Sequence, residues 1–267
     1  MKSDIVDISV ISLVMVYALA FTLFLVLKII KSKNEYNFLK SLIRMSIQLL
    51  FIGYVLKYIF AVNSLYLIVI MYIIMSAFAT HTIMGKVNFK IKNQFFLIFF
   101  PIFTIGLLMT LFFQLLVTNT SPWYEARYFI PISGMILGNS MNACALSIER
   151  LISEIKSNIA KVETLISLGA SSFEAVSESI YRSIRAASLP IITNMSGIGI
   201  VFLPGLMTGQ ILSGTDPIIS IKYQIAIMVC IVSSISFSSI LLIFQTYKKF
   251  FDKKGNLKKE LLSEQDI

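Results

Sequence analysis

The chain has 267 residues, of which 57% are hydrophobic and only 14% are charged, and its mean hydropathy is +0.82. Soluble domains contain about 45–50% apolar and about 25% charged residues, so this composition excludes an ordinary soluble protein. A net charge of +9 would suit a nucleic-acid-binding protein, but the basic residues are confined to short stretches between long uncharged runs. We therefore expect an integral membrane protein whose partners are the lipid bilayer and other proteins, not nucleic acid.

Seven segments are apolar and long enough to cross a bilayer as α-helices, which takes about 20 residues. The second segment requires the side chains of Arg44 and Lys57 to extend to the two lipid surfaces. We predict an all-α, polytopic integral membrane protein with about seven transmembrane helices in a single domain, residues 1–267. The expected spans are about 6–27, 40–60, 64–84, 94–116, 127–148, 189–212 and 222–247.

The basic residues are unevenly divided between the two sides of these spans. Most of the 23 Lys and Arg residues lie in 28–44, 86–92, 150–185 and 248–259, which all fall on one side. The positive-inside rule places that side in the cytoplasm. We expect a multi-pass protein of the cell membrane with its N-terminus outside and its C-terminus in the cytoplasm. Topology then accounts for the excess of basic charge.

The longest connection, about residues 150–187, is predicted to form two cytoplasmic amphipathic helices. Apolar residues repeat with helical spacing in 151–168, and polar residues, Glu154 among them, occupy the other positions. Gly169 supplies the end of the first helix. Ser171 and Glu174 match the S-x-x-E capping box that begins a second helix, whose apolar stripe starts at Phe173. Pro190 is expected to begin the next span.

Three interpretations of this helix-turn-helix compete. A DNA-binding motif is disfavoured, because the pair lacks a third helix and is tethered to membrane spans at both ends. An interfacial helix pair lying on the lipid surface is an alternative. The third is a docking element, since E163-T-L-I-S-L-G169 has the spacing of the E-A-A-x-x-x-G motif in ABC-transporter permeases. The residues assigned to docking are Glu163, Gly169, Ala170, Ser171, Phe173 and Glu174.

The second half of the chain resembles the FetB-type permease family, iron exporters of bacteria that are related to plant half-transporter subunits linked to aluminium sensitivity. The stretches that carry the resemblance are GMILGNSMN (134–142), ETLISLGA (163–170), RSIRAASLP (182–190), LPGLMTGQILSG (203–214) and KYQIAIM (222–228). Together they cover roughly residues 127–250. The first half agrees in pattern, chiefly over RMSIQLLFIGYVL (44–56).

The resemblance implies a transmembrane permease subunit that forms a homodimer core and exports a metal, iron in particular, by means of a separate ABC ATPase. The chain contains no G-x-x-x-x-G-K-[ST] phosphate loop, so ATP and Mg²⁺ are expected on the partner and no cofactor on this chain. It is not expected to be an enzyme, because one histidine and no G-x-S-x-G offer little for covalent catalysis. A different small solute, such as a nucleotide sugar, and a secondary carrier or channel stay open as alternatives.

Polar residues within the fifth span are candidates for a transport pathway. A helical projection places Met135, Asn139 and Asn142 on one face, either to hold neighbouring helices or to line a path at the protomer interface. Soft sulfur ligands and amides nearby extend the candidate set. That set is Met135, Asn139, Met141, Asn142, Cys144, Asn194 and Met207.

Glycine pairs with the spacing small-x-x-x-small predict close helix packing in the fifth and sixth spans. These pairs are Gly134 with Gly138 and Gly205 with Gly209. The sixth span also contains several helix breakers, so we expect it to be interrupted at membrane depth. Cys144 and Cys230 both lie within spans, which argues against a disulfide framework.

Overall fold

The computed structural model of the chain describes residues 8–30, 35–87, 93–252 and 254–263. Every structural statement below refers to these residues. Residues 6 and 7 of the first predicted span lie outside the described residues. So do six of the lysines counted for the topology, namely Lys2, Lys31, Lys33, Lys90, Lys92 and Lys253.

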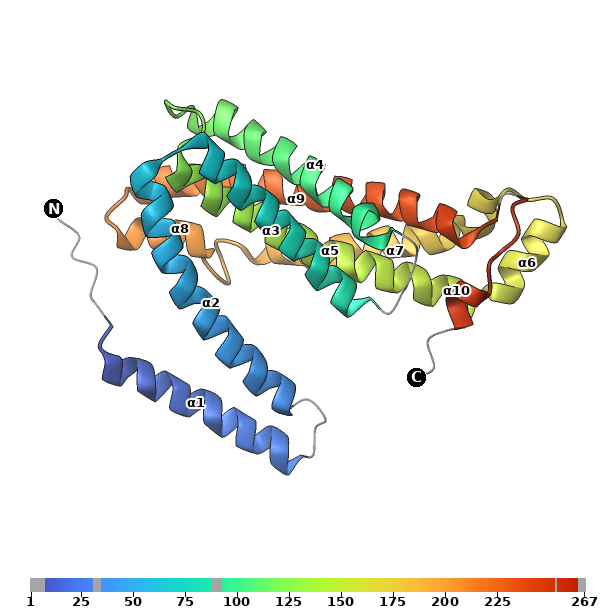
Figure 1. Cartoon of the computed structure of the whole chain (residues 1–267), viewed down its shortest axis with the longest axis horizontal. Helices are drawn as coiled ribbons and strands as arrows, with labels where there is room; N and C mark the ends of the chain where they lie inside the picture. Colours follow the sequence, from blue (N-terminus) through green and yellow to red (C-terminus); the bar gives the residue numbers. More distant parts are fainter. Residues whose placement is uncertain (1–7, 31–34, 88–92, 253, 264–267) are drawn as a thin grey trace.

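Long helices make up almost all of the described part of the chain (Figure 1). Six of its helices are long and apolar enough to cross a membrane, which confirms the predicted all-α polytopic membrane fold. The elements are α1 (Val10–Ile29), α2 (Glu35–Val62), α3 (Leu65–Lys86), α4 (Gln94–Phe112), a π-helical turn (Phe113–Thr118), α5 (Ala126–Ser157), α6 (Ile159–Ser167), α7 (Ser172–Gly197), α8 (Gly205–Leu212), α9 (Pro217–Tyr247), a 3-10 turn (Lys248–Phe250) and α10 (Glu260–Ser263).

Helix α5 is the centre of the bundle and contacts α3, α4, α7 and α9. Its contact with α9 is made by small side chains: the Oγ atoms of Ser140 and Ser234 lie 2.8 Å apart, and both residues are buried. Ser133 and Ser147, seven residues before and after Ser140, are also buried and donate to backbone carbonyls of α5. Small residues let membrane helices approach closely, so serine takes in this bundle the packing role that glycine often has.

Helices α1 and α2 lie apart from the bundle (Figure 1). No residue of α1 is buried, and Ile59 is the one buried residue of α2. A cavity of about 520 Å³ separates the two helices and is lined by apolar side chains such as Leu23 and Phe38. The two helices are nevertheless strongly apolar, which suits them to contact with lipid tails along most of their surface.

The structure differs from the sequence-based boundaries at Pro190. The second amphipathic helix and the start of the sixth predicted span are one continuous helix, α7, which passes through Pro190. The buried face that begins at Val176 and Ile180 continues without a change of phase to Ala187 and Ile191, and so favours one straight element. Membrane helices tolerate an internal proline because neighbours satisfy the freed backbone groups.

The predicted span 189–212 is therefore not a single helix. It consists of the last turns of α7, an irregular segment over 198–204, and the short helix α8. Gly199 has φ +85°, a conformation that favours glycine, and the Val201 N–H donates to the Gly197 carbonyl at 2.8 Å. Pro204 then precedes α8, so the expected interruption lies in this segment and not at Pro190.

Candidate functional site

The polar face of α5 is open in the single chain. Asn139 and Asn142 are both exposed, as the helical projection indicates, whereas the opposite side of α5 is buried in the bundle. The Asn139 amide donates to the Met135 carbonyl at 2.8 Å, and the Asn142 side-chain oxygen accepts from the Lys86 ammonium of α3 at 3.4 Å. Polar side chains at membrane depth rarely face lipid, so this face requires a protein partner or water.

The other candidate ligands do not gather around this face. Asn194 is exposed near the end of α7. In contrast, Cys144 is fully buried, Met207 is 8% exposed, and Met141 packs against the apolar core. The described residues contain no group of three or more His, Cys, Asp or Glu that could hold a metal ion. Weak, changing contacts along a path are therefore a better description of this face than a rigid metal cage.

One end of the open face borders a cavity of about 180 Å³ between α4, α5, α8 and α9. Met135, from the middle of α5, and Arg127, from its start, both line this cavity. The side-chain oxygen of Gln210 in α8 also belongs to a lining residue, and it is buried without a hydrogen-bond partner. The cavity is mainly apolar, with a few polar groups at its edge.

The four glycines assigned to helix packing have few neighbours within the chain. A Cβ at Gly134 would lie 3.3 Å from the Met75 methyl group of α3, so this glycine does permit a close contact. A Cβ at Gly138, Gly205 or Gly209 would have no heavy atom within 4 Å. If these three serve close packing, the helix that approaches them must come from another chain.

The turn between α6 and α7 has the local structure that its sequence predicts. Gly169 has φ +94°, and the N–H groups of Gly169 and Ala170 donate to the carbonyls of Ile166 and Leu165, which is a Schellman ending for α6. Ser171 caps α7: its hydroxyl accepts from the Glu174 N–H at 3.3 Å, and the Glu174 carboxylate accepts from the Ser171 N–H at 2.7 Å.

These hydrogen bonds affect the charge of the turn. The Ser171 hydroxyl, and after it the Ser171 backbone N–H, stabilise the Glu174 carboxylate and hold its pKa below the ordinary value. The turn therefore keeps a negative charge at the start of α7, where the helix dipole also favours an anion.

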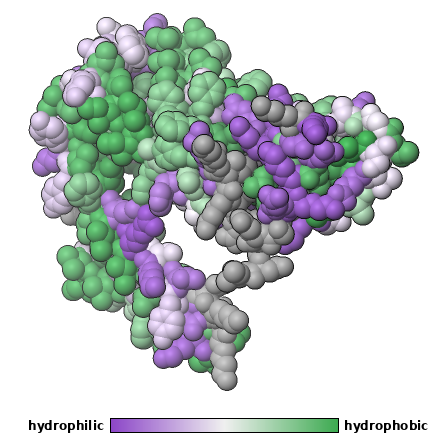
Figure 2. Space-filling view, turned by 45° about the vertical axis from the view of Figure 1, so that its right-hand side comes forward, coloured by the Kyte–Doolittle hydropathy of each residue, from purple (hydrophilic) through white to green (hydrophobic). Residues whose placement is uncertain are grey.

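The tip of the turn exposes apolar surface to the exterior of the molecule. Leu168 is 79% exposed, and Phe173, which is half exposed, stacks on Phe244 with ring centroids 6.0 Å apart. Glu163 does not point freely outward, because its carboxylate forms an ion pair with Lys259 at 2.7 Å. The C-terminal segment thus lies beside α6 and forms part of the same surface. Figure 2 shows hydrophilic residues gathered at this end of the molecule and hydrophobic residues along the long helices.

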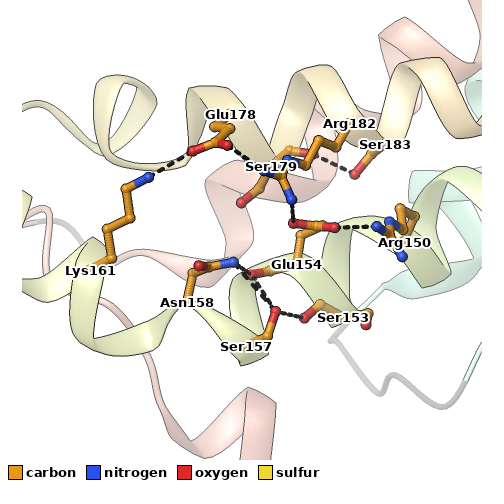
Figure 3. Close-up of polar contacts among 10 residues, drawn as sticks. All are labelled: Arg150, Ser153, Glu154, Ser157, Asn158, Lys161, Glu178, Ser179, Arg182 and Ser183. Atoms are coloured by element: carbon orange, nitrogen blue, oxygen red, sulfur yellow. Dashed lines mark hydrogen bonds and ion pairs between the residues drawn. The ribbon is translucent and has the colours of Figure 1, made fainter.

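The interior of the helix-turn-helix contains a charge that the sequence pattern misplaced. Glu154 was expected among the polar positions of the first amphipathic helix, yet it is 6% exposed. It lies only 60° around the helix from Leu151, so it belongs to the buried stripe. The structure also shows no helix boundary at residue 150, since α5 continues to Ser157. Figure 3 shows Glu154 between two arginines, Arg150 of α5 and Arg182 of α7.

Residues 10–251 match the family model described as "Uncharacterised protein family (UPF0014)". The chain belongs to this family. The match starts in α1 and ends after α9, so it includes the open face of α5 and the turn at Gly169 in one continuous alignment. The resemblance of the second half of the chain to the FetB-type permeases thus extends to a shared family over most of its length.

Three relatives show the range of proteins that the UPF0014 chain is similar to. It is 35% identical over 246 residues to the "Probable iron export permease protein FetB" of Escherichia coli, which covers 90% of this chain and 93% of that protein. It is 32% identical over 252 residues to the UPF0014 membrane protein YjkA of Bacillus subtilis, which covers 92% and 96%. It is 29% identical over 229 residues to the "Protein ALUMINUM SENSITIVE 3" of Arabidopsis thaliana, which covers 86% and 82%. No solved structure matches the chain.

Proposed function

We propose that this chain is the membrane permease subunit of an ABC transporter that exports iron or another metal, with ATP hydrolysed on a separate subunit. The observation that carries the proposal is the 35% identity over nine-tenths of the chain to a protein named as a probable iron export permease. The geometry agrees with it. One helix, α5, runs from the open face at Asn139 to the joint with α6, and α6 leads directly to the exposed turn at Gly169.

The docking half of the proposal rests on the turn itself. An exposed Leu168, a half-exposed Phe173 and a fixed Schellman ending give a rigid protrusion with apolar contact surface. Buried apolar anchors supply most of the energy of a protein interface. An ABC ATPase subunit is the partner that the E-x-x-x-x-x-G spacing of Glu163 and Gly169 favours.

The pathway half requires a second copy of the chain. The open face of α5 and the glycines that lack neighbours lie on one protomer without a covering helix. A homodimer with two-fold symmetry would bring the two α5 faces together around a central path, and closed two-fold dimers are the commonest assemblies. The Asn139 and Asn142 amides would then offer weak oxygen ligands to the cargo from both sides.

The docking claim is tested by copurification with the ATPase subunit in mild detergent. Leu168→Asp should strongly reduce the amount of ATPase that a tagged chain retains, because it places a charge at the apolar tip. Ser153→Asp is the matched control, since it adds the same charge at an exposed position of α5 away from the turn. Equal retention by both variants would contradict docking at this turn.

The transport claim is tested in vesicles that contain the chain and its ATPase. We expect ATP-dependent efflux of iron(II) in preference to a panel of other metal ions and nucleotide sugars. Asn139→Leu and Asn142→Leu should lower the efflux, whereas both proteins should still reach the membrane. Efflux that is unchanged in both variants would leave the amides a packing role only. Movement of a nucleotide sugar in place of metals would favour the alternative cargo.

A further inference from the structure

Glu154 lies at the joint of three helices, near the end of α5. Its Oε1 is 2.6 Å from Nη2 of Arg150, one turn earlier in α5, and its Oε2 is 3.5 Å from Nη1 of Arg182 in α7. Arg182 in turn contacts Glu178 at 2.6 Å, and Glu178 contacts Lys161 of α6 at 2.7 Å. Figure 3 shows these contacts as one connected network across α5, α6 and α7.

The backbone of the same residue holds the joint between α5 and α6. Helix α5 ends at Ser157, and the break before α6 is the single residue Asn158. The Asn158 side chain donates to the Glu154 carbonyl at 2.8 Å, which satisfies one of the carbonyls left free at a helix end. Glu154 therefore connects to α7 through its carboxylate and to the start of α6 through its carbonyl.

Burial distinguishes Glu154 from the other carboxylates of this region. Its side chain is 8% exposed, whereas those of Glu178 and Glu163 are 54% and 41% exposed. Ion pairs at the surface contribute little because water and salt screen them. A buried carboxylate that loses a partner is left uncompensated, so the contact between Glu154 and Arg182 resists separation of α5 from α7 more than the exposed pairs do.

We propose that Glu154 is a positioning residue that fixes the α6–α7 turn to α5, so that a displacement of the turn moves the Asn139 face of α5. The transport consequence rests on the proposed function. The mechanical link does not, because it is a property of the chain alone. A cavity of about 210 Å³ beside the network, lined by Lys161, Glu178 and Arg182, leaves room for the joint to rearrange when the link is lost.

Hydrogen exchange of the purified chain tests the link directly. Glu154→Gln preserves the size of the side chain and removes its charge. We expect amides of α6 and of the first turns of α7 to exchange about tenfold faster or more. Glu149→Gln is the matched control, because this neighbouring carboxylate of α5 is exposed and takes no part in the network of Figure 3. Equal exchange in the two variants would overturn the proposal.

A double-mutant cycle then assigns the effect to the contact with Arg182. If Glu154 acts through Arg182, adding Arg182→Gln to Glu154→Gln should accelerate exchange less than the two single effects predict. Fully additive effects would contradict the assignment. Glu178→Gln with Arg182→Gln provides the comparison cycle for the exposed pair, and its coupling should be the smaller of the two.

A labelling experiment tests transmission to the pathway face. Asn139→Cys introduces one exposed thiol, and the natural Cys144 and Cys230 are buried. In the complex with the ATPase subunit, ATP should change the rate at which a water-soluble maleimide labels this thiol. Adding Glu154→Gln should abolish the change while ATP hydrolysis continues. A persistent response would overturn transmission through Glu154. A parent complex without any response to ATP would contradict the proposed function, and the exchange result would still decide the link.

Discussion

Gly106 of α4 lies where α3, α4 and α5 meet. A Cβ at this position would be 2.7 Å from Cδ2 of Leu137 and 2.8 Å from the hydroxyl oxygen of Tyr72, both closer than real contacts allow. Tyr72 is held in place by a hydrogen bond to the Phe103 carbonyl at 2.9 Å, so it cannot retreat without losing that bond. Glycine is therefore a steric requirement of this three-helix contact.

We predict that Gly106→Ala destabilises the protein by about 1–3 kcal/mol, the usual cost of overpacking a core. Thermal unfolding in detergent should show a lower Tm. Gly53→Ala is the matched control, because Gly53 also lies inside a helix and a Cβ there meets nothing within 4 Å. That substitution should leave the Tm unchanged or raise it slightly through the better helix propensity of alanine. Equal effects of the two substitutions would contradict the packing argument.

Residue by residue, the sequence indicated faces more reliably than partners. The projection of α5 correctly placed Asn139 and Asn142 on one side, because helical geometry alone determines that result. The burial of Glu154 could have been expected from its 60° offset from Leu151. Its pairing with Arg182 could not, since the two residues are 28 positions apart and meet only through the packing of α7 on α5.

At the scale of single elements, the start of α7 depends on pH. The pKa of Glu174 is lowered in the folded protein by the hydrogen bonds that the Ser171 hydroxyl and N–H donate. A lowered pKa means that the stabilisation is complete above the unfolded value, about 4.3 for glutamate, and is lost as the pH falls through the folded value. We predict that protection of the first amides of α7 against exchange decreases on acidification below about pH 4.3.

The variant Ser171→Ala isolates the capping box from other acidic groups of the turn. It removes the hydroxyl contribution, so the start of α7 should be less protected at neutral pH and should lose less protection on acidification. Glu178, whose carboxylate is held by Lys161 and Arg182, is unchanged in this variant. An identical acid response in both proteins would show that Glu178 or another group is responsible.

The helix ends were predictable wherever one residue type dictates the backbone. Gly169 with its positive φ and the Ser171–Glu174 box both lie where the sequence places them. Pro190 shows the opposite case, because in a membrane bundle a proline can remain inside a helix. The continuous buried stripe from Val176 to Ile191 carried the information, and it outweighs the local signal of one proline.

At the scale of the whole molecule, the two ends of the chain are attached very differently. Helix α1 contacts α2 and buries none of its residues. The C-terminal segment, in contrast, buries Phe250 and Phe251 in the main core, pairs Phe251 with Leu257, and connects Lys259 to Glu163. Hydropathy gave no indication of this difference, because it reports how apolar a helix is and not which helix it packs against.

We therefore predict that releasing α1 changes the stability of the bundle little. A protease site placed within 31–34 would allow cleavage after purification, so that insertion into the membrane is not disturbed. The Tm of the cleaved protein should stay close to that of the intact protein, since the contacts among α3, α4, α5, α7 and α9 are preserved.

The matched experiment shortens the other end of the chain. A variant that stops after Phe250 lacks the pairing of Phe251 with Leu257 and the ion pair between Lys259 and Glu163. Because Phe251 is 6% exposed, its loss should leave a gap in the core and lower the Tm by several degrees. It should also increase hydrogen exchange in α6, where Glu163 loses its partner. A larger loss of stability on cleavage of α1 than on this truncation would mean that α1 packs against the bundle in the membrane.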